Sequence, residues 1–250
     1  MTTSSISLLD TAAQEPARIL QLYQFLELFI EGEPPRNTLF VLERAPLSVM
    51  GANGDRLLLI DPPASATAKF HLEGAATSIF TGEVRESGLP QLQTKPGGVA
   101  HIRMGEHFLD IYSQQDSNVI YFPALGILCA GSFGSDATIP KLAAGSDGNE
   151  ELATLRLLAQ LVKRNLRLFL PQVGTFCEEA RQAMQRLAED VGYLHSLRRV
   201  VPFLAQRGDA LENVWQVAES LLPKGRNSSS SKLTHQRNIE HLWSISQITN

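Results

Sequence analysis

Residues 118–132 read NVIYFPALGILCAGS, and this stretch says most about the fold. Two short apolar runs, NVIYF and GILCAG, flank the turn Pro123-Ala124-Leu125-Gly126. Short apolar runs bounded by proline and glycine are typical of buried β-strands. The stretch therefore predicts two neighbouring strands, at 118–122 and 126–131, joined by a short turn.

More β-rich runs precede this pair. Turn residues such as Ala52-Asn53-Gly54-Asp55 and Pro96-Gly97-Gly98 separate them. The expected strands are 38–43, 46–50, 56–61, 77–81, 99–104 and 107–113. Strands spaced this closely favour antiparallel pairing in a sandwich of two sheets.

The N-terminal segment has a different pattern. From Pro16 to Ile30, apolar residues recur at steps of three and four, which is typical of an amphipathic helix. The residues of this stripe are Ile19, Leu22, Tyr23, Leu26, Phe29 and Ile30. Gly32 and the Pro34-Pro35 pair would end the helix. A stripe this wide predicts packing on the domain's own core or contact with another subunit.

The second half of the chain alternates helices with a strand. The expected elements are helices at 150–163, 175–192 and 209–222 and a strand at 167–171. Segment 224–232, with GRNSSSS at its centre, is polar throughout and predicts a linker before a last helix within 233–250. Strands followed by alternating helix and strand indicate an α+β fold with helices flanking two sheets.

Composition narrows the class of protein. The chain has 250 residues, of which 43% are hydrophobic, so it can bury a full core. The formal net charge of -4 is uneven, because residues 161–250 hold 12 Lys and Arg against 8 Asp and Glu. A basic half could meet an acidic partner or nucleic acid. Its basic residues alternate with glutamate and apolar residues at helical spacing, however, so ordinary solvated helix faces are favoured and nucleic acid is not expected.

The lack of a recognisable targeting signal and the spacing of the cysteines favour a cytoplasmic protein. The N-terminus lacks a basic segment followed by an apolar run, and no stretch of about 18 apolar residues occurs, so no membrane association is expected. Cys129 and Cys177 lie far apart and outside any zinc-binding spacing, which suits a reducing compartment.

A series of stretches occurs in an order that a known family shares. They are Asn37–Leu42 with Leu57–Pro62, Ile79–Pro90, Ser113–Pro123, Gly126–Ser132 and Leu168–Gly174. Together they resemble the metallo-β-lactamase superfamily over about residues 37–195. The resemblance implies a four-layer αββα metallo-β-lactamase-like sandwich, here with extra N- and C-terminal helices. The expected division is an N-terminal helix at 1–36, the domain at 37–223, a linker at 224–232 and a C-terminal helix at 233–250.

The positions that the resemblance assigns to metal ligands are altered. Where the family has TH-x-H-x-D-H, this chain has Gly82-Glu83-Val84-Arg85-Glu86-Ser87, without a histidine. Serines replace a histidine at Ser113 and the bridging aspartate at Ser132, and Val173 replaces the last histidine. The resemblance thus implies a degenerate member with a vestigial cleft and no catalytic residue, metal or cofactor. The residues of this cleft are Asp61, Glu83, Glu86, Ser113, Ser132 and Val173.

Valine has no lone pair to donate, and a serine hydroxyl is a poor zinc ligand at neutral pH. Glu83 and Glu86 could hold Mg²⁺ with water, but an exposed acidic loop is the favoured interpretation. Asp61 is expected to hold its turn by accepting backbone N–H bonds. His101 and His107 could face each other across a turn and form a relocated metal site, although a hairpin with polar outer faces is favoured.

Two further side chains, those of Ser132 and Cys177, are candidate nucleophiles. Ser132 lies in a glycine-rich loop without the G-x-S-x-G elbow, so it is not expected to act as a nucleophile. Cys177 precedes an expected helix, whose dipole could lower the pKa of its thiol, but a plain helix residue is favoured.

The expected function is that of a binding or scaffold subunit that associates with a protein partner or with copies of itself. The alternative is a hydrolase that has rebuilt the cleft with Glu83, Glu86, Ser113 and Ser132. Trp215 and Trp243 on the C-terminal helices favour association slightly, because tryptophan is enriched at interfaces.

Overall fold

The computed structural model describes residues 17–43, 56–70, 72, 75–104, 107–115 and 117–248. The chain forms two compact units, Met1–Ile79 with Val84–Leu92 and Phe80–Glu83 with Gln93–Asn250. Each unit contains one five-stranded sheet. The strand expected at 46–50 lies outside the described residues.

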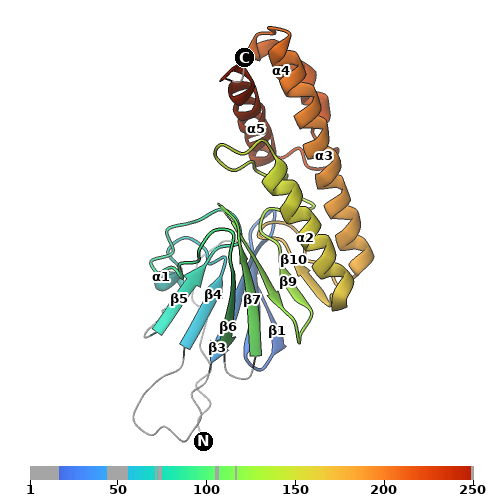
Figure 1. The fold of residues 1–250 in the computed structure, drawn as a ribbon. Coiled ribbons are helices and arrows are strands. Elements are labelled where there is room, and N and C mark those ends of the chain that lie inside the picture. The colour runs from blue at the N-terminus through green and yellow to red at the C-terminus, as the bar shows by residue number, and fades with distance from the viewer. Residues whose placement is uncertain are drawn as a thin grey trace, which may run out of the picture. The chain divides into compact units, whose positions relative to one another are not determined.

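The first unit contains the sheet β1-β2-β3-β4-β5, in the order of the sequence (Figure 1). Its strands are β1 Arg18–Tyr23, β2 Leu26–Glu31, β3 Arg36–Glu43, β4 Arg56–Ile60 and β5 Ala75–Ile79. A short helix, α1 Ala66–Lys69, connects the last two. The ring of Phe70 meets Phe29 and Phe40 edge to face, with centroids 5.1 Å and 5.0 Å away, so aromatic packing joins α1 to the sheet.

The helix expected between Pro16 and Ile30 is wrong. Strands β1 and β2 form an antiparallel hairpin there, in which Leu20 pairs with Leu28. Leu26 and Leu28 are buried and Glu27 between them is only partly so, which is the alternation of a strand. Because β2 also pairs with β3, ladder hydrogen bonds on both of its edges outweigh the helical spacing of the apolar residues.

The second unit contains the sheet β10-β9-β8-β7-β6. Its strands are β6 Val99–Met104, β7 His107–Ser113, β8 Asn118–Phe122, β9 Ile127–Cys129 and β10 Leu168–Leu170. The strands expected within the described residues are thus found, but antiparallel pairing is not general. The pairs β4/β5 and β9/β10 are parallel, because a crossover containing a helix connects the two strands of each pair.

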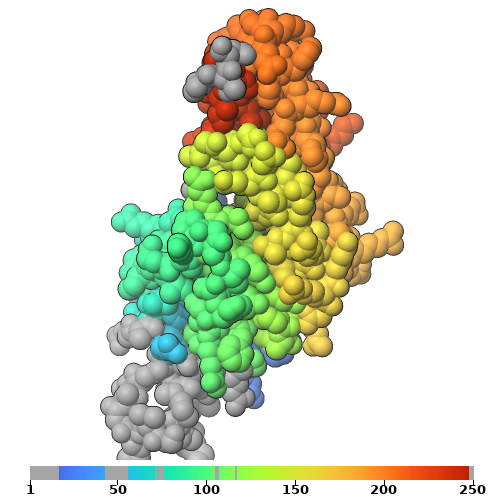
Figure 2. All heavy atoms as spheres, in the orientation of Figure 1, coloured from blue at the N-terminus to red at the C-terminus, as the bar shows by residue number. Residues whose placement is uncertain are grey.

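Helices complete the second unit. They are α2 Asn149–Asn165, α3 Ala180–Gln206, α4 Leu211–Ala218, the 3₁₀ turn η1 Glu219–Leu221 and α5 Ser229–Ile248. The main core joins strand residues such as Leu128 and Phe169 to helix residues such as Leu155 and Leu194. Figure 2 shows the atoms of α2 (yellow) directly against those of α3 (orange). Helix α3 extends well past the predicted end at residue 192. No helix in the described part of the chain is long and apolar enough to span a membrane.

The segment between η1 and α5 is shorter than the linker expected at 224–232. Helix α5 begins at Ser229, inside this segment. Arg226 and Ser231 are buried, and the Ser231 hydroxyl donates to the carbonyl of Ala137 over 3.0 Å. The sequence predicted a linker because the segment lacks apolar residues. In the structure, buried polar side chains hold the segment through hydrogen bonds. The expected C-terminal helix is found, and its Ile239 and Leu242 belong to the main core.

Candidate functional site

Two of the expected cleft residues lie in the first unit. Asp61 follows β4 with a φ of 55°, its backbone N–H donates to Ile79 O over 2.9 Å, and its carbonyl accepts from Thr38 Oγ1 over 2.9 Å. The side chain of Glu86 is exposed, and its carbonyl accepts the N–H of Ser65 over 2.9 Å. Both residues therefore connect distant segments of the first unit through their backbone.

The second unit brings together three segments, 80–83, 131–136 and 171–175. Ala130 N–H donates to Leu170 O over 2.8 Å, which continues the β9/β10 pairing into the loops. Gly131 has a φ of 63°, and a Cβ there would lie 2.2 Å from the carbonyl oxygen of Thr81. Only glycine permits this approach of the first two segments.

Gln172 cross-links these segments through its side-chain amide. Glu83 N–H donates to Gln172 Oε1 over 2.9 Å, and Gln172 Nε2 donates to the Glu83 carbonyl over 3.0 Å. The backbone N–H of Gln172 also donates to Gly131 O over 2.8 Å. We call these three bonds the Gln172 clamp. Sequence reasoning missed Gln172, because its partner Glu83 lies 89 residues away and no local spacing reveals the pairing.

Val173, next along the chain, is held through its backbone. The buried Ser135 hydroxyl donates to Val173 O over 2.6 Å and accepts from Ala137 N–H over 3.0 Å. Asp136 accepts from the Thr175 N–H over 2.8 Å and pairs with Arg186 Nη2 at 3.3 Å. These hydrogen bonds fix the turn after β10. They use the backbone carbonyl of Val173 and not its apolar side chain.

The two expected serines differ in burial. Ser113, at the end of β7, is 2% exposed, and its backbone pairs with Gly97 and Gly98. Ser132 is partly exposed and lies beside the first segment, because a Cβ on Gly82 would be 3.3 Å from Ser132 N. Gly82, the residue before Glu83, therefore lies beside the backbone of Ser132, whereas Ser113 is withdrawn from solvent.

The residues present do not fit the metal that the resemblance implies. Zinc in proteins takes imidazole, thiolate or carboxylate ligands, usually three or four of them. Among the described residues, no group of three or more His, Cys, Asp or Glu is placed to hold a metal ion. Near Ser132, the amide oxygen of Gln172 already accepts a backbone N–H.

No protein-family model and no curated protein matches the sequence. Among solved structures, the stereoselective inverting sec-alkylsulfatase Pisa1 from Pseudomonas sp. matches with a TM-score of 0.59 and 10% identity, over 92% of this chain and 50% of that one. A double mutant of the same sulfatase gives a TM-score of 0.63 and 11% identity, over 89% of this chain and 49% of that one.

A β-lactamase domain protein from Burkholderia ambifaria matches with a TM-score of 0.56 and 9% identity, over 92% of this chain and 88% of that one. This chain has a metallo-β-lactamase-like fold. The likeness concerns the fold alone, because identity is low throughout, and the chain spans about half the length of the alkylsulfatases it matches. The matches with the sulfatases and the Burkholderia protein cover about nine tenths of this chain.

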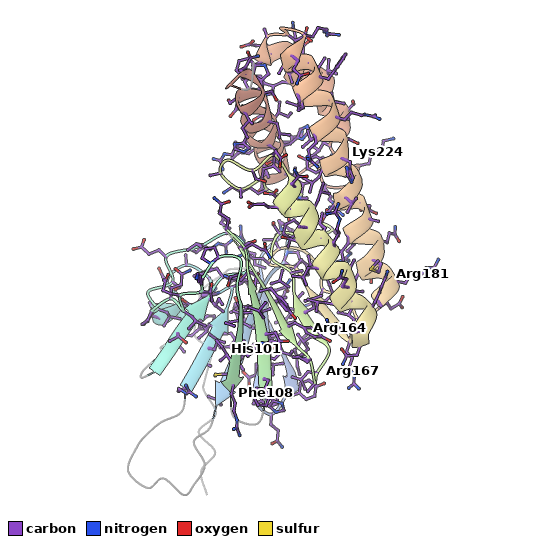
Figure 3. All side chains as sticks on the ribbon, in the orientation of Figure 1. His101, Phe108, Arg164, Arg167, Arg181 and Lys224 are labelled. Atoms are coloured by element: carbon purple, nitrogen blue, oxygen red, sulfur yellow. The ribbon has the colours of Figure 1, made fainter. Side chains whose placement is uncertain are left out.

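The relocated site at His101 and His107 is not formed in this metallo-β-lactamase-like fold. His101 pairs with Asp110 across the β6/β7 hairpin, with Nδ1 and Oδ1 2.7 Å apart. Asp110 and His107 are three residues apart on one strand, so their side chains point to opposite faces of the sheet. His101 therefore faces away from His107. Figure 3 shows His101 and Phe108 on the sheet, apart from the helix residue Arg181.

Cys177 does not have the environment of a reactive thiol. It lies before α3, which begins at Ala180, and its backbone pairs with Phe169 over 2.8 Å and 3.0 Å. Burial raises the pKa of the Cys177 thiol, and the nearby Arg186 offsets this only in part. The thiolate is disfavoured, in contrast to the lowering that a helix N-terminus would cause.

A buried ion pair lies behind the 131–138 segment. Asp190 on α3 is 0% exposed; it accepts from Gly134 N–H over 2.6 Å and pairs with Nη1 of Arg226. Arg226 is 3% exposed; its Nη2 pairs with Glu189 at 2.8 Å. Burial raises the pKa of Asp190 to about 7, although Arg226 and the Gly134 amide act to lower it.

A second buried network, of neutral groups, holds α5 on α3. His235 Nε2 lies 3.0 Å from the Ala218 carbonyl and Nδ1 lies 3.0 Å from the Tyr193 hydroxyl. Asn238 Nδ2 donates to the same hydroxyl over 3.1 Å. Because a carbonyl can only accept, Nε2 carries the proton and Nδ1 accepts from tyrosine. Burial accordingly lowers the pKa of His235.

Proposed function

We propose that this chain is a catalytically degenerate protein of the metallo-β-lactamase fold that acts by binding, as a scaffold or partner subunit. The observation that carries the proposal is the Gln172 clamp. Beside Val173, where the resemblance would place a ligand histidine, the chain has an amide whose two ends are occupied by the backbone of Glu83.

The chemistry supports this proposal. The resemblance implies that hydrolysis in this family needs a bound metal. The metal activates water and polarises the bond to be cut. Valine, serine and a glutamine amide that is already bonded cannot supply such a site. The two units nevertheless retain their own buried apolar clusters, so the fold has been kept while the donors have changed. The expected partner is another protein or a second copy of this chain.

Metal analysis and light scattering on the purified full chain test the proposal together. We expect zinc, manganese and iron each well below one per chain, no turnover of phosphoester, thioester, lactam or alkyl sulfate substrates, and a mass above that of a monomer. About one metal per chain, or turnover that a chelator abolishes, would contradict the degenerate site. A monomer at all concentrations would contradict association between copies, and pull-down with a defined partner would then be required to sustain the binding role.

The alternative, a rebuilt hydrolase, has one observation in its favour. Gly82 lies beside the backbone of Ser132, so Glu83, which bears a carboxylate, directly follows a neighbour of the hydroxyl-bearing Ser132 at the loop end of the second sheet. Ser113 is buried, and Glu86 belongs to the first unit. If this alternative holds, Glu83→Gln and Ser132→Ala each abolish a measurable turnover, while the exposed control Glu178→Gln leaves it unchanged.

A further inference from the structure

We infer that the side-chain amide of Gln172 replaces, as a cross-link, the metal that would otherwise tie these loops together. The inference rests on the proposed function only in its premise that no metal occupies the site. It assigns to Gln172 the role of a positioning residue, which holds segment 80–83 on the turns after β9 and β10.

The geometry of the bonds is the first argument. One side chain satisfies both the N–H and the carbonyl of Glu83, as a neighbouring strand would in one rung of a ladder. The backbone N–H of the same residue bonds to Gly131. Gln172 therefore joins all three segments, and in the family those segments would each bring ligands to a shared metal.

The local packing is the second argument. Gln172 is 7% exposed, and a Cβ on Gly82 would lie 2.8 Å from its Oε1. The absence of a side chain on Gly82 is what lets the amide reach the backbone of the next residue. Gly131 permits the matching approach on the other side, against Thr81. Gly82 thus makes room for the Gln172 amide and Gly131 for the Thr81 carbonyl, so the junction is formed by several residues together.

The chemical difference from a metal makes the inference testable. A metal cross-link responds to chelators, because its ligands separate when the ion leaves. An amide bonded to backbone groups carries no charge and responds to neither chelator nor moderate acid. The amide must also keep both of its functions, since Glu83 presents one donor and one acceptor.

Hydrogen exchange on the full chain tests this directly. In Gln172→Met, which keeps the volume but loses both bonds, we expect the backbone amides of residues 80–84 to exchange at least about tenfold faster than in the wild type. In Gln172→Glu the acceptor remains but the donor to Glu83 O is lost, so exchange should also rise. The control is Gln185→Met on the exposed face of α3, which should leave this segment unchanged. Circular dichroism confirms that each variant is folded.

The outcomes separate the two proposals. Unchanged exchange at residues 80–84 in both Gln172 variants overturns the cross-link and leaves the proposed function standing. Faster exchange in the wild type after chelator treatment reveals a metal and overturns the proposed function. If Gln172→Met does not fold, the more conservative Gln172→Glu decides: increased exchange confined to 80–84 supports the cross-link, and wild-type exchange overturns it.

Discussion

Two cross-links hold the 131–138 segment of the second unit, and their chemistry differs. On one side, the neutral Gln172 clamp joins Gly131 to Glu83. On the other side, the charged pair of Asp190 and Arg226 holds Gly134 and Thr138, with Arg226 Nη1 3.4 Å from Thr138 O. Both connect residues far apart in sequence, and both are almost wholly buried.

The two cross-links respond differently to solution conditions. On folding, the Gln172 amide replaces hydrogen bonds to water with hydrogen bonds to backbone groups. All of these groups are uncharged, so burial of the amide costs little free energy and is independent of pH. A buried ion pair loses the hydration of two charges, and either charge left alone is strongly unfavourable. Glu189, whose side chain is 48% exposed, gives Arg226 a second counter-ion at the surface. We expect the ionic cross-link to be the more sensitive of the two.

The largest expected effect comes from removing the buried arginine. Arg226→Met leaves the Asp190 carboxylate buried without its cation and should lower the free energy of unfolding by about 3–5 kcal/mol at pH 8. Because protonated Asp190 needs no counter-ion, the loss should be smaller at pH 5. Urea denaturation at the two pH values measures this.

Two further variants control that experiment. The double variant Arg226→Met with Asp190→Asn removes the stranded charge and should recover part of the stability at pH 8. Arg198→Met breaks an exposed pair with Asp147 and should cost no more than about 1 kcal/mol. A loss for Arg226→Met that is equal at both pH values, and equal to that of Arg198→Met, would show that burial of the pair does not matter.

The pH dependence of stability is the next effect. The pKa of Asp190 rises from 3.8 to about 7 on folding, so between these values the folded state holds a proton that the unfolded state has released. The stability contributed by this group is therefore full below pH 3.8 and is lost as the pH rises through about 7. The free energy of unfolding of the wild type, minus that of Asp190→Asn, should fall from pH 4.5 to pH 8.

His235 acts in the opposite direction, which is why the variant must be compared with the wild type. Its pKa is lowered from 6.5, so its contribution is present above that value and is lost in more acidic solution. Both proteins in the comparison retain His235, so its effect cancels. A difference that is constant with pH would mean that Asp190 titrates at its ordinary value, and one that rises with pH would mean that folding lowers its pKa.

These two cross-links also mark the limit of prediction from sequence. Local apolar pattern and turn residues predicted the strands around residues 118–131, the helix at 149–165 and the part of the last helix beyond residue 233. They did not reveal Gln172 and Arg226, because their partners lie 89 and 36 residues away and only the fold brings them together. The N-terminal hairpin was missed for a related reason. The hairpin pairs with β3 only in the folded protein, and this tertiary contact cannot be read from the hairpin's own sequence. The spacing of its apolar residues at three and four is a local pattern, and it indicated a helix.

The candidate site divides in the same way. The resemblance drew attention to the segments of Glu83, Ser132 and Val173, and the second unit does bring these segments together. It also singled out Ser113, which is buried, while Asp61 and Glu86 belong to the first unit. The resemblance indicates which residues occupy the ligand positions of the family. It does not indicate which side chains lie between those positions. That depends on the length and direction of neighbouring side chains such as Gln172.

The smallest expected effect concerns Asp61, which the sequence predicted to hold its turn. Its φ of 55° is a left-handed conformation that aspartate and asparagine tolerate better than alanine does. Asp61→Ala should therefore lower the free energy of unfolding by about 1 kcal/mol, measured by urea denaturation. Asp61→Asn and Asp61→Gly are the matched controls, since both adopt this conformation readily and keep the backbone bonds to Ile79 and Thr38. If Asn is as damaging as Ala, the carboxylate itself matters rather than the backbone. If all three are neutral, the turn is held by the ladder and the Thr38 hydroxyl alone.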